Sequence, residues 1–256
     1  MYNIVFFTFS HPPVATMAQQ QTPSQYTKVL VFDTETTGLP DGRPGLYELK
    51  RWPHIVQLSY VLYDTVKNKI LISNDHIIRV APSVPISPKS IEMHGITRER
   101  SEREGIDIRD ALDLFQVCAT AADVVVAHNL AFDKKMIMVE NIRAGFKNAR
   151  GNPLKLFPKD DPASTSYCCT MKENVDFCQI RAVSYTGEEY YKYPRLNELY
   201  YKLFNCHPAA SQLHNSMVDV LLCLRCFVKQ EFNADLLLIN PAFKRTITKH
   251  QIHAAA

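Results

Sequence analysis

Two acidic residues separated by one position carry the clearest chemical signal in the sequence. Asp33 and Glu35 follow directly on the apolar run 29–32. Side chains alternate along a strand, so both carboxylates are expected on the same side. Neighbouring carboxylates repel and raise one another's pKa unless a cation lies between them. Carboxylate oxygens suit a hard divalent ion, which makes this pair a candidate metal site.

A third acidic residue, Asp133, follows the second short apolar run, 123–127. We expect it near the carboxyl end of a buried strand, at the start of the next helix. Asn129 lies four residues earlier and would share a helix face with it if the helix begins early. The earlier pair, Asp33 and Glu35, is not decisive alone, because an Asp-x-Glu after a strand is more often a turn or a cap than a metal site.

A fourth acidic residue, Asp219, lies in an otherwise apolar helical segment, 217–232. A carboxylate there is costly to bury unless its charge is compensated. His214 precedes it by five residues, which would turn the two apart on one continuous helix. We therefore expect His214 on a mobile loop, with Asn215 or Ser216 capping the helix. A loop histidine beside a metal suits a general base.

The elements that must position these residues can be predicted from their patterning. Three strands in series suggest an antiparallel meander, and alternating helices and strands follow. This order predicts an α/β fold with one mixed central sheet, a meander plus parallel strands, and helices on both faces. The expected strands are 28–32, 55–63, 69–80, 123–127 and 167–171, and the expected helices are 87–94, 108–122, 132–144, 196–204 and 217–232.

The chain of 256 residues is long enough for one domain with additions, which we place at 27–235. Residues 1–26 read as a disordered leader and 236–256 as a frayed tail. Two segments, 147–166 and 174–194, look like insertions on the expected substrate side. One interpretation is that they set substrate choice, and the simpler one, which we favour, is that they are solvated loops.

Composition bears on which partners the protein could have and in which cell compartment it would lie. The net charge of +3 neither requires nor excludes a nucleic-acid partner. Seven cysteines without a pattern of zinc spacing, and a Cys223-x-x-Cys226 pair inside an apolar helix, predict buried thiols in a reducing compartment. No apolar run reaches the length of a membrane helix, so we expect an intracellular protein of the cytoplasm or nucleus without a membrane partner.

Three motifs together resemble one known family. They are Asp-Thr-Glu-Thr-Thr-Gly-Leu at 33–39, His-Asn-Leu-Ala-Phe-Asp at 128–133 and His-x4-Asp at 214–219. In this combination the chain, over roughly residues 28–232, resembles the DEDDh subgroup of the DnaQ-like 3′–5′ exonucleases. The sister DEDDy subgroup would need tyrosine at position 215, where this chain has asparagine.

The resemblance implies an RNase H-like fold, a function and a set of site residues. It implies hydrolysis of DNA or RNA from the 3′ end, releasing nucleoside 5′-monophosphates with two Mg²⁺ ions, for which Mn²⁺ would substitute. His214 would be the general base. The implied metal ligands are Asp33, Glu35, Asp133 and Asp219, and the implied substrate contacts are Thr36, Leu39, His94 and Asn129.

Several alternatives stay open at this point. The domain could bind nucleic acid without cutting it, act as a related endonuclease, or serve a replication assembly whose activity needs a partner. Leu39 is equally well read as ordinary packing, and His94 as a surface histidine. The sequence does not distinguish DNA from RNA, or proofreading from repair or RNA processing. It also leaves open a homodimer or a polymerase-type partner in trans.

Overall fold

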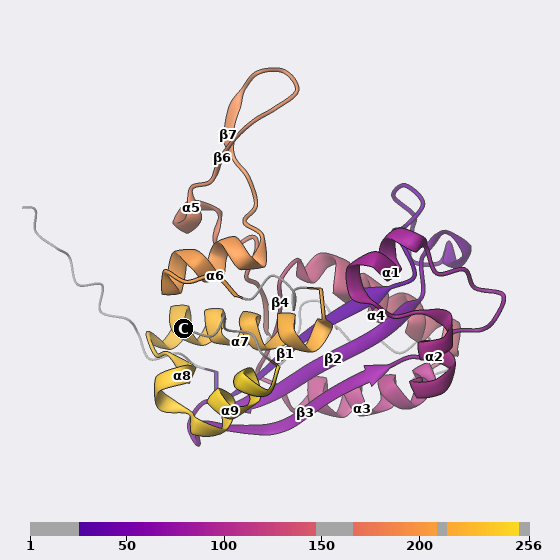
Figure 1. The fold of residues 1–256 in the computed structure, drawn as a ribbon, viewed down its shortest axis with the longest axis horizontal. Helices are drawn as coiled ribbons and strands as arrows, with labels where there is room; N and C mark the ends of the chain where they lie inside the picture. Colours follow the sequence, from indigo (N-terminus) through magenta and orange to yellow (C-terminus); the bar gives the residue numbers. More distant parts are fainter. Residues whose placement is uncertain (1–25, 147–165, 209–213, 251–256) are drawn as a thin grey trace, which may run out of the picture.

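The computed structural model describes residues 26–146, 166–208 and 214–250 of the chain. Its centre is a five-stranded sheet in the order β3-β2-β1-β4-β5 (Figure 1). β1 pairs antiparallel with β2 and parallel with β4, which confirms the predicted mixed sheet. The strands are β1 (Lys28–Thr36), β2 (Ile55–Asp64), β3 (Lys69–Ile77), β4 (Val124–Ala127) and β5 (Ser166–Cys169).

Alternation along β1 sends successive side chains to two separate cores. Val29 and Val31 pack toward α7 (Ser216–Phe232), whereas Leu30 and Phe32 pack on the other side of the sheet. That second side is covered by α3 (Ile108–Ala121) and α4 (Leu130–Ala144), so helices cover both faces, as expected (Figure 1). The odd-numbered residues of β1 therefore point toward α7.

The first strand is longer than the sequence predicts. We expected β1 to end at residue 32, but it continues through both acidic residues to Thr36. In the ladder Asp33 lies opposite Ser59 and Glu35 opposite Gln57. The pairing with β2 thus fixes the backbone beneath both carboxylates, which are held on a strand and not on a turn.

Two helices follow the meander along the chain, before α3. α1 (Pro88–His94) begins at the predicted proline and is capped by the Ser87 hydroxyl. α2 (Arg98–Glu104) was not predicted, because it has no apolar stripe. Ser101 joins this helix to the residues after β3, because it is fully buried and donates a hydrogen bond to the carbonyl of Ile78 at 2.8 Å.

The segment 174–194 is more ordered than the expected solvated loop. It forms α5 (Val175–Cys178) and a hairpin of β6 (Arg181–Val183) and β7 (Glu189–Tyr191). Figure 1 shows this hairpin projecting beyond α6 (Leu196–Phe204), away from the sheet. Most of the other expected insertion, 147–166, and almost all of the leader lie outside the described residues.

The expected frayed tail was wrong for the residues up to 250. They form α8 (Leu236–Ile239) and α9 (Pro241–Lys249), and Asn240 caps α9 by accepting from the amide of Phe243 at 2.9 Å. Phe243 and Ile247, one helical turn apart, are fully buried in the core on the α7 side. This spacing places both side chains on one face of α9. Two apolar residues among several basic ones are too weak a pattern to predict a helix.

Replacing Phe243 with alanine tests whether this helix belongs to the folded domain. We expect Phe243→Ala to lower the free energy of unfolding by about 3–5 kcal/mol, because it leaves a cavity in the core. Leu238→Ala, at a side chain that is 83% exposed, is the matched control and should change stability little. Equal small losses in urea denaturation would show that α9 does not contribute to the core.

The predicted state of the cysteines is confirmed for the pair on α7. Cys223 and Cys226 are buried in the helix, and all seven cysteines of the chain are free thiols. Among the described residues, no helix is both long and apolar enough to cross a membrane.

Candidate metal centre and active site

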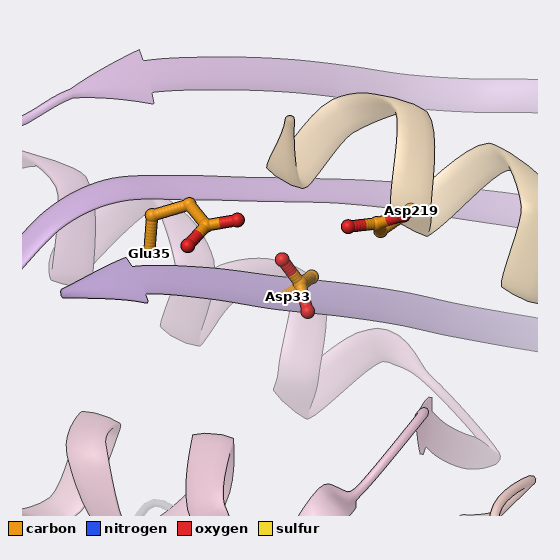
Figure 2. Close-up of side chains that lie close together, drawn as sticks. All are labelled: Asp33, Glu35 and Asp219. Atoms are coloured by element: carbon orange, nitrogen blue, oxygen red, sulfur yellow. The ribbon is translucent and has the colours of Figure 1, made fainter. Parts of the chain in front are cut away.

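Three of the four predicted acidic ligands converge above β1. Oxygen atoms of Asp33, Glu35 and Asp219 all lie within 4.8 Å of one another. Figure 2 shows the two carboxylates of β1 and the carboxylate of α7 turned toward the same space. The strand contributes two ligands because residues two apart share a face, and α7 contributes the third because it packs on that face.

The electrostatics of this group call for a cation. Burial, and then the charges of Asp33, Asp219 and Asp133, raise the pKa of Glu35 to about 9. Burial likewise raises the pKa of Asp33 to about 6 and that of Asp219 well above its ordinary range. Carboxylates so arranged cannot all ionise near neutral pH without compensation, and a divalent ion would supply it. The donor set, oxygen only, fits Mg²⁺ or Mn²⁺.

Glu35→Gln should remove the loss of folding stability that ionisation of the buried Glu35 carboxyl causes in the metal-free protein. The folded-state pKa of Glu35 lies above its ordinary value of 4.5, so the native state binds this proton more tightly than the unfolded state. Native stability should therefore fall as pH rises from about 4.5 toward 9, and fall less in the variant. Denaturation in EDTA across this range measures it, with the exposed Glu102→Gln as control. Parallel pH profiles for Glu35→Gln and the native chain would contradict the assignment.

The fourth predicted ligand, Asp133, is not part of this group of three. It is buried on α4, and its Oδ1 accepts hydrogen bonds from the backbone amide of Thr34 at 3.0 Å and from the Thr34 hydroxyl at 2.7 Å. Thr34 alternates with its acidic neighbours and points to the α4 side of the sheet. Asp133 still lies close enough for its charge to raise the pKa of Glu35. It therefore lies beside the carboxylate group without belonging to it.

His214 lies directly before α7 in a left-handed backbone conformation, with φ of 68°. Its side chain is exposed, and its backbone hydrogen-bonds the Asp219 carboxylate, lowering the pKa of that group. The expected break between loop and helix is confirmed: Asn215 caps α7 by accepting from the amide of Val218 at 3.3 Å. This short turn ties His214 to the metal-ligand candidate Asp219.

Ser216 was not identified as a site residue from the sequence. Its hydroxyl donates to the backbone carbonyl of Asp33 at 2.8 Å and also lowers the pKa of the Asp33 carboxyl. This contact joins the first turn of α7 to β1. A buried serine at the start of an otherwise apolar helix was the available signal, and we considered it only as a cap.

These groups open into a cleft of about 610 Å³. Asp33, Asp219 and His214 line it together with the residues before and at the start of α6. His128, at the end of β4, also lines it; burial lowers its pKa to about 4, so the ring is neutral near pH 7. Its Nε2 donates to the carbonyl of Pro194 and its Nδ1 accepts from Thr170, each at 3.0 Å. The remaining lining residues are Met93, Met171, Tyr193, Pro194, Arg195, Leu196 and Asn197.

The four predicted substrate contacts lie in different environments. Leu39 is 83% exposed, which is not the ordinary packing we held as its alternative. Asn129 is exposed at the start of α4 and makes no capping bond, so it does not share the buried setting of Asp133. Thr36 is buried, with its hydroxyl donating to the Gly38 carbonyl at 2.7 Å.

His94 is buried, and the alternative of a plain surface histidine was wrong. Its Nδ1 accepts from the amide of Ile96 at 3.0 Å, which leaves Nε2 to donate to the carbonyl of Thr36 at 3.2 Å. Both ring nitrogens are thus occupied within the protein. The visible role of His94 is to hold α1 against the end of β1.

Comparison with known protein families matches this architecture to one of them. The sequence model of the RNase_T family, described as an exonuclease family, matches residues 30–227. The chain belongs to this exonuclease family. Membership confirms the resemblance to DnaQ-like exonucleases and places the chain among nucleases, which are hydrolases. A comparison with curated protein sequences gave no significant match.

Solved structures show the same fold. Exonuclease I of E. coli in complex with a dT13 oligonucleotide is 15% identical, with a TM-score of 0.58 over 81% of this chain and 42% of that one. The moderately thermophilic Exonuclease I of Methylocaldum szegediense is 14% identical, with a TM-score of 0.56 over 83% of this chain and 42% of that one. The chain thus spans less than half the length of these structures. At such low identity the match supports the RNase H-like fold alone.

Proposed function

We propose that this protein is a metal-dependent 3′–5′ exonuclease of the DEDDh subgroup that hydrolyses phosphodiester bonds and releases nucleoside 5′-monophosphates. The observation that carries the proposal is the convergence of the Asp33, Glu35 and Asp219 carboxylates, two of which, Asp33 and Asp219, line one cleft with His214. Family membership supports the nuclease class. The polarity, the product and the subgroup are proposals from the motifs.

The acidic residues would hold two divalent ions. Asp33, Glu35 and Asp219 would hold the first, and Asp33 together with Asp133 would support the second. When bound, such ions neutralise the phosphodiester, activate water and stabilise the leaving oxygen. The chain itself contributes the rigid arrangement: β1 fixes two carboxylates by strand pairing, and the Ser216 hydroxyl holds α7 against β1 at 2.8 Å.

His214 would accept the proton of the attacking water. Its exposed ring lies on the turn whose backbone contacts Asp219, so it can approach the water without being buried in the fold. The neutral His128 has both ring nitrogens engaged and is less suited to this role. Leu39, exposed on the loop after β1, would contact the terminal nucleotide through its apolar side chain.

The proposed substrate is the 3′ end of a single strand. This rests on the resemblance and on Exonuclease I of E. coli, whose structures hold dT13 and dA16 oligonucleotides. DNA is therefore the first candidate, and RNA is the alternative to test.

A degradation assay with 5′-labelled DNA and RNA of the same sequence tests the proposal. With Mg²⁺ or Mn²⁺, we expect a ladder that shortens by one nucleotide at a time, and no cleavage in EDTA. Blocking the 3′ end of the oligonucleotide should stop the reaction. Cleavage of the blocked strand would indicate an endonuclease, and binding without cleavage would favour a nucleic-acid-binding or replication-associated subunit that needs a partner.

A further inference from the structure

We propose that the hairpin segment 180–195, here called the arm, is a binding platform for the single-stranded part of the substrate that lies beyond the cleft. The proposal rests on the proposed function, because it takes nucleic acid as the ligand. It adds a surface and a mode of contact, stacking of bases on exposed tyrosines. The arm comprises β6, β7 and the residues that lead from β7 to α6, and Figure 1 shows it standing free of the sheet.

The arm exposes aromatic rings that its own fold does not use. Tyr185 is fully exposed, and Tyr190, Tyr191 and Tyr193 are each exposed by 43–55%. Four such rings within nine residues form a concentration of apolar surface that normally marks an interaction site. Bases stack on rings of this kind with little regard to sequence, which suits an enzyme that removes nucleotides one after another from any strand.

The arm also places a cation beside one of these rings. Arg181 lies directly opposite Tyr191 in the β6–β7 ladder, so their side chains share one face of the hairpin. Arg181 is exposed and forms no ion pair with the described part of the chain. A ring with a free guanidinium beside it offers both stacking for a base and charge for its phosphate.

The arm is continuous with the cleft of the carboxylates. Lys192 extends the pairing through its amide, which donates to the carbonyl of Ile180 at 2.9 Å, while its ammonium group contacts Glu198 of α6 at 2.7 Å. Alternation turns the neighbouring Tyr191 and Tyr193 away from this anchor. Tyr193 then lines the cleft together with Asp33 and His214.

Because the arm continues from the cleft, the ligand that fits it is the part of the single strand that extends out of the cleft. A strand that leaves the cleft past Tyr193 next meets Tyr191 and Arg181 on the same segment. The base of the arm is fixed at the cleft, because the carbonyl of Pro194 accepts the hydrogen bond of His128 at 3.0 Å. The end of the arm that carries Tyr193 is therefore anchored beside the carboxylates, where a polymer substrate would leave the cleft.

Fluorescence anisotropy with a labelled 20-nucleotide strand, in EDTA to prevent cleavage, tests the arm. Tyr191→Ala should raise the Kd about tenfold, the effect of losing one stacked base, whereas Tyr191→Phe should keep it within about twofold. Tyr47→Ala is the matched control, because Tyr47 is 73% exposed but lies on the loop between β1 and β2. A nucleoside 5′-monophosphate has no second base to stack on Tyr191, so the native chain and Tyr191→Ala should bind it alike.

The possible results separate this inference from the proposed function. Weaker binding of Tyr191→Ala to the long strand, in a protein that binds but does not cleave, would support the arm and refute the exonuclease. Unchanged binding of Tyr191→Ala in an active exonuclease would overturn the inference and leave the tyrosines as a protein-docking surface. Failure of the native chain to bind either DNA or RNA would overturn it as well.

Discussion

Asp219→Asn is expected to lower the rate of phosphodiester hydrolysis by about 10³-fold or more while the protein stays folded. Loss of a metal ligand removes several kcal/mol of transition-state stabilisation, and each 1.4 kcal/mol corresponds to about tenfold in rate. Asp33→Asn should behave in the same way. The measurement is single-turnover cleavage of the labelled strand at saturating enzyme.

The same variant should be at least as stable as the native chain without metal. Burial and the charge of Asp33 raise the pKa of Asp219, so its ionised form disfavours the fold, and asparagine removes that cost. Asp113→Asn, an exposed aspartate on α3, is the control and should change neither property. Near-normal activity of Asp219→Asn would mean that the three carboxylates do not form the catalytic metal site.

His214→Ala should lower the chemical rate by about 10²- to 10⁴-fold, the usual contribution of a general base. Because the side chain is exposed, the free energy of unfolding and the affinity for Mn²⁺ should be unchanged. Added imidazole should restore part of the rate in the alanine variant.

His207→Ala serves as the matched control, since His207 is exposed and stacks on Tyr201 with ring centroids 4.3 Å apart. It should cleave at the native rate. If His214→Ala also cleaves at the native rate, another group takes the proton. If it loses metal binding instead, His214 would be a ligand and not the base.

Much of the carboxylate group could be predicted because it depends on local periodicity. Asp33 and Glu35 lie on one face of β1 for the same reason that Val29 and Val31 do. Asp219 stood out as the acid in an apolar helix, and only a helix packed on that face could bring it to the pair. The fold class followed from the order of strands and helices, which is also a property of the sequence pattern.

The remaining features depend on contacts between distant residues. The hydrogen bonds from Thr34 to Asp133 join residues 99 positions apart, and the sequence around Asp133 does not indicate them. The hydrogen bond of His94 likewise joins it to the carbonyl of Thr36, 58 positions away, a backbone group without any sequence signal. The hairpin in 174–194 was missed because its strands are three residues long and mostly exposed.

The measurement that tests the central claim most directly is anomalous diffraction from crystals soaked in Mn²⁺. We predict an anomalous peak within bonding distance of carboxylate oxygens of Asp33, Glu35 and Asp219, and its loss in crystals of Asp219→Asn. A native crystal that binds Mn²⁺ elsewhere, or shows no peak among these three carboxylates, would contradict the claim that they form the metal centre of the enzyme.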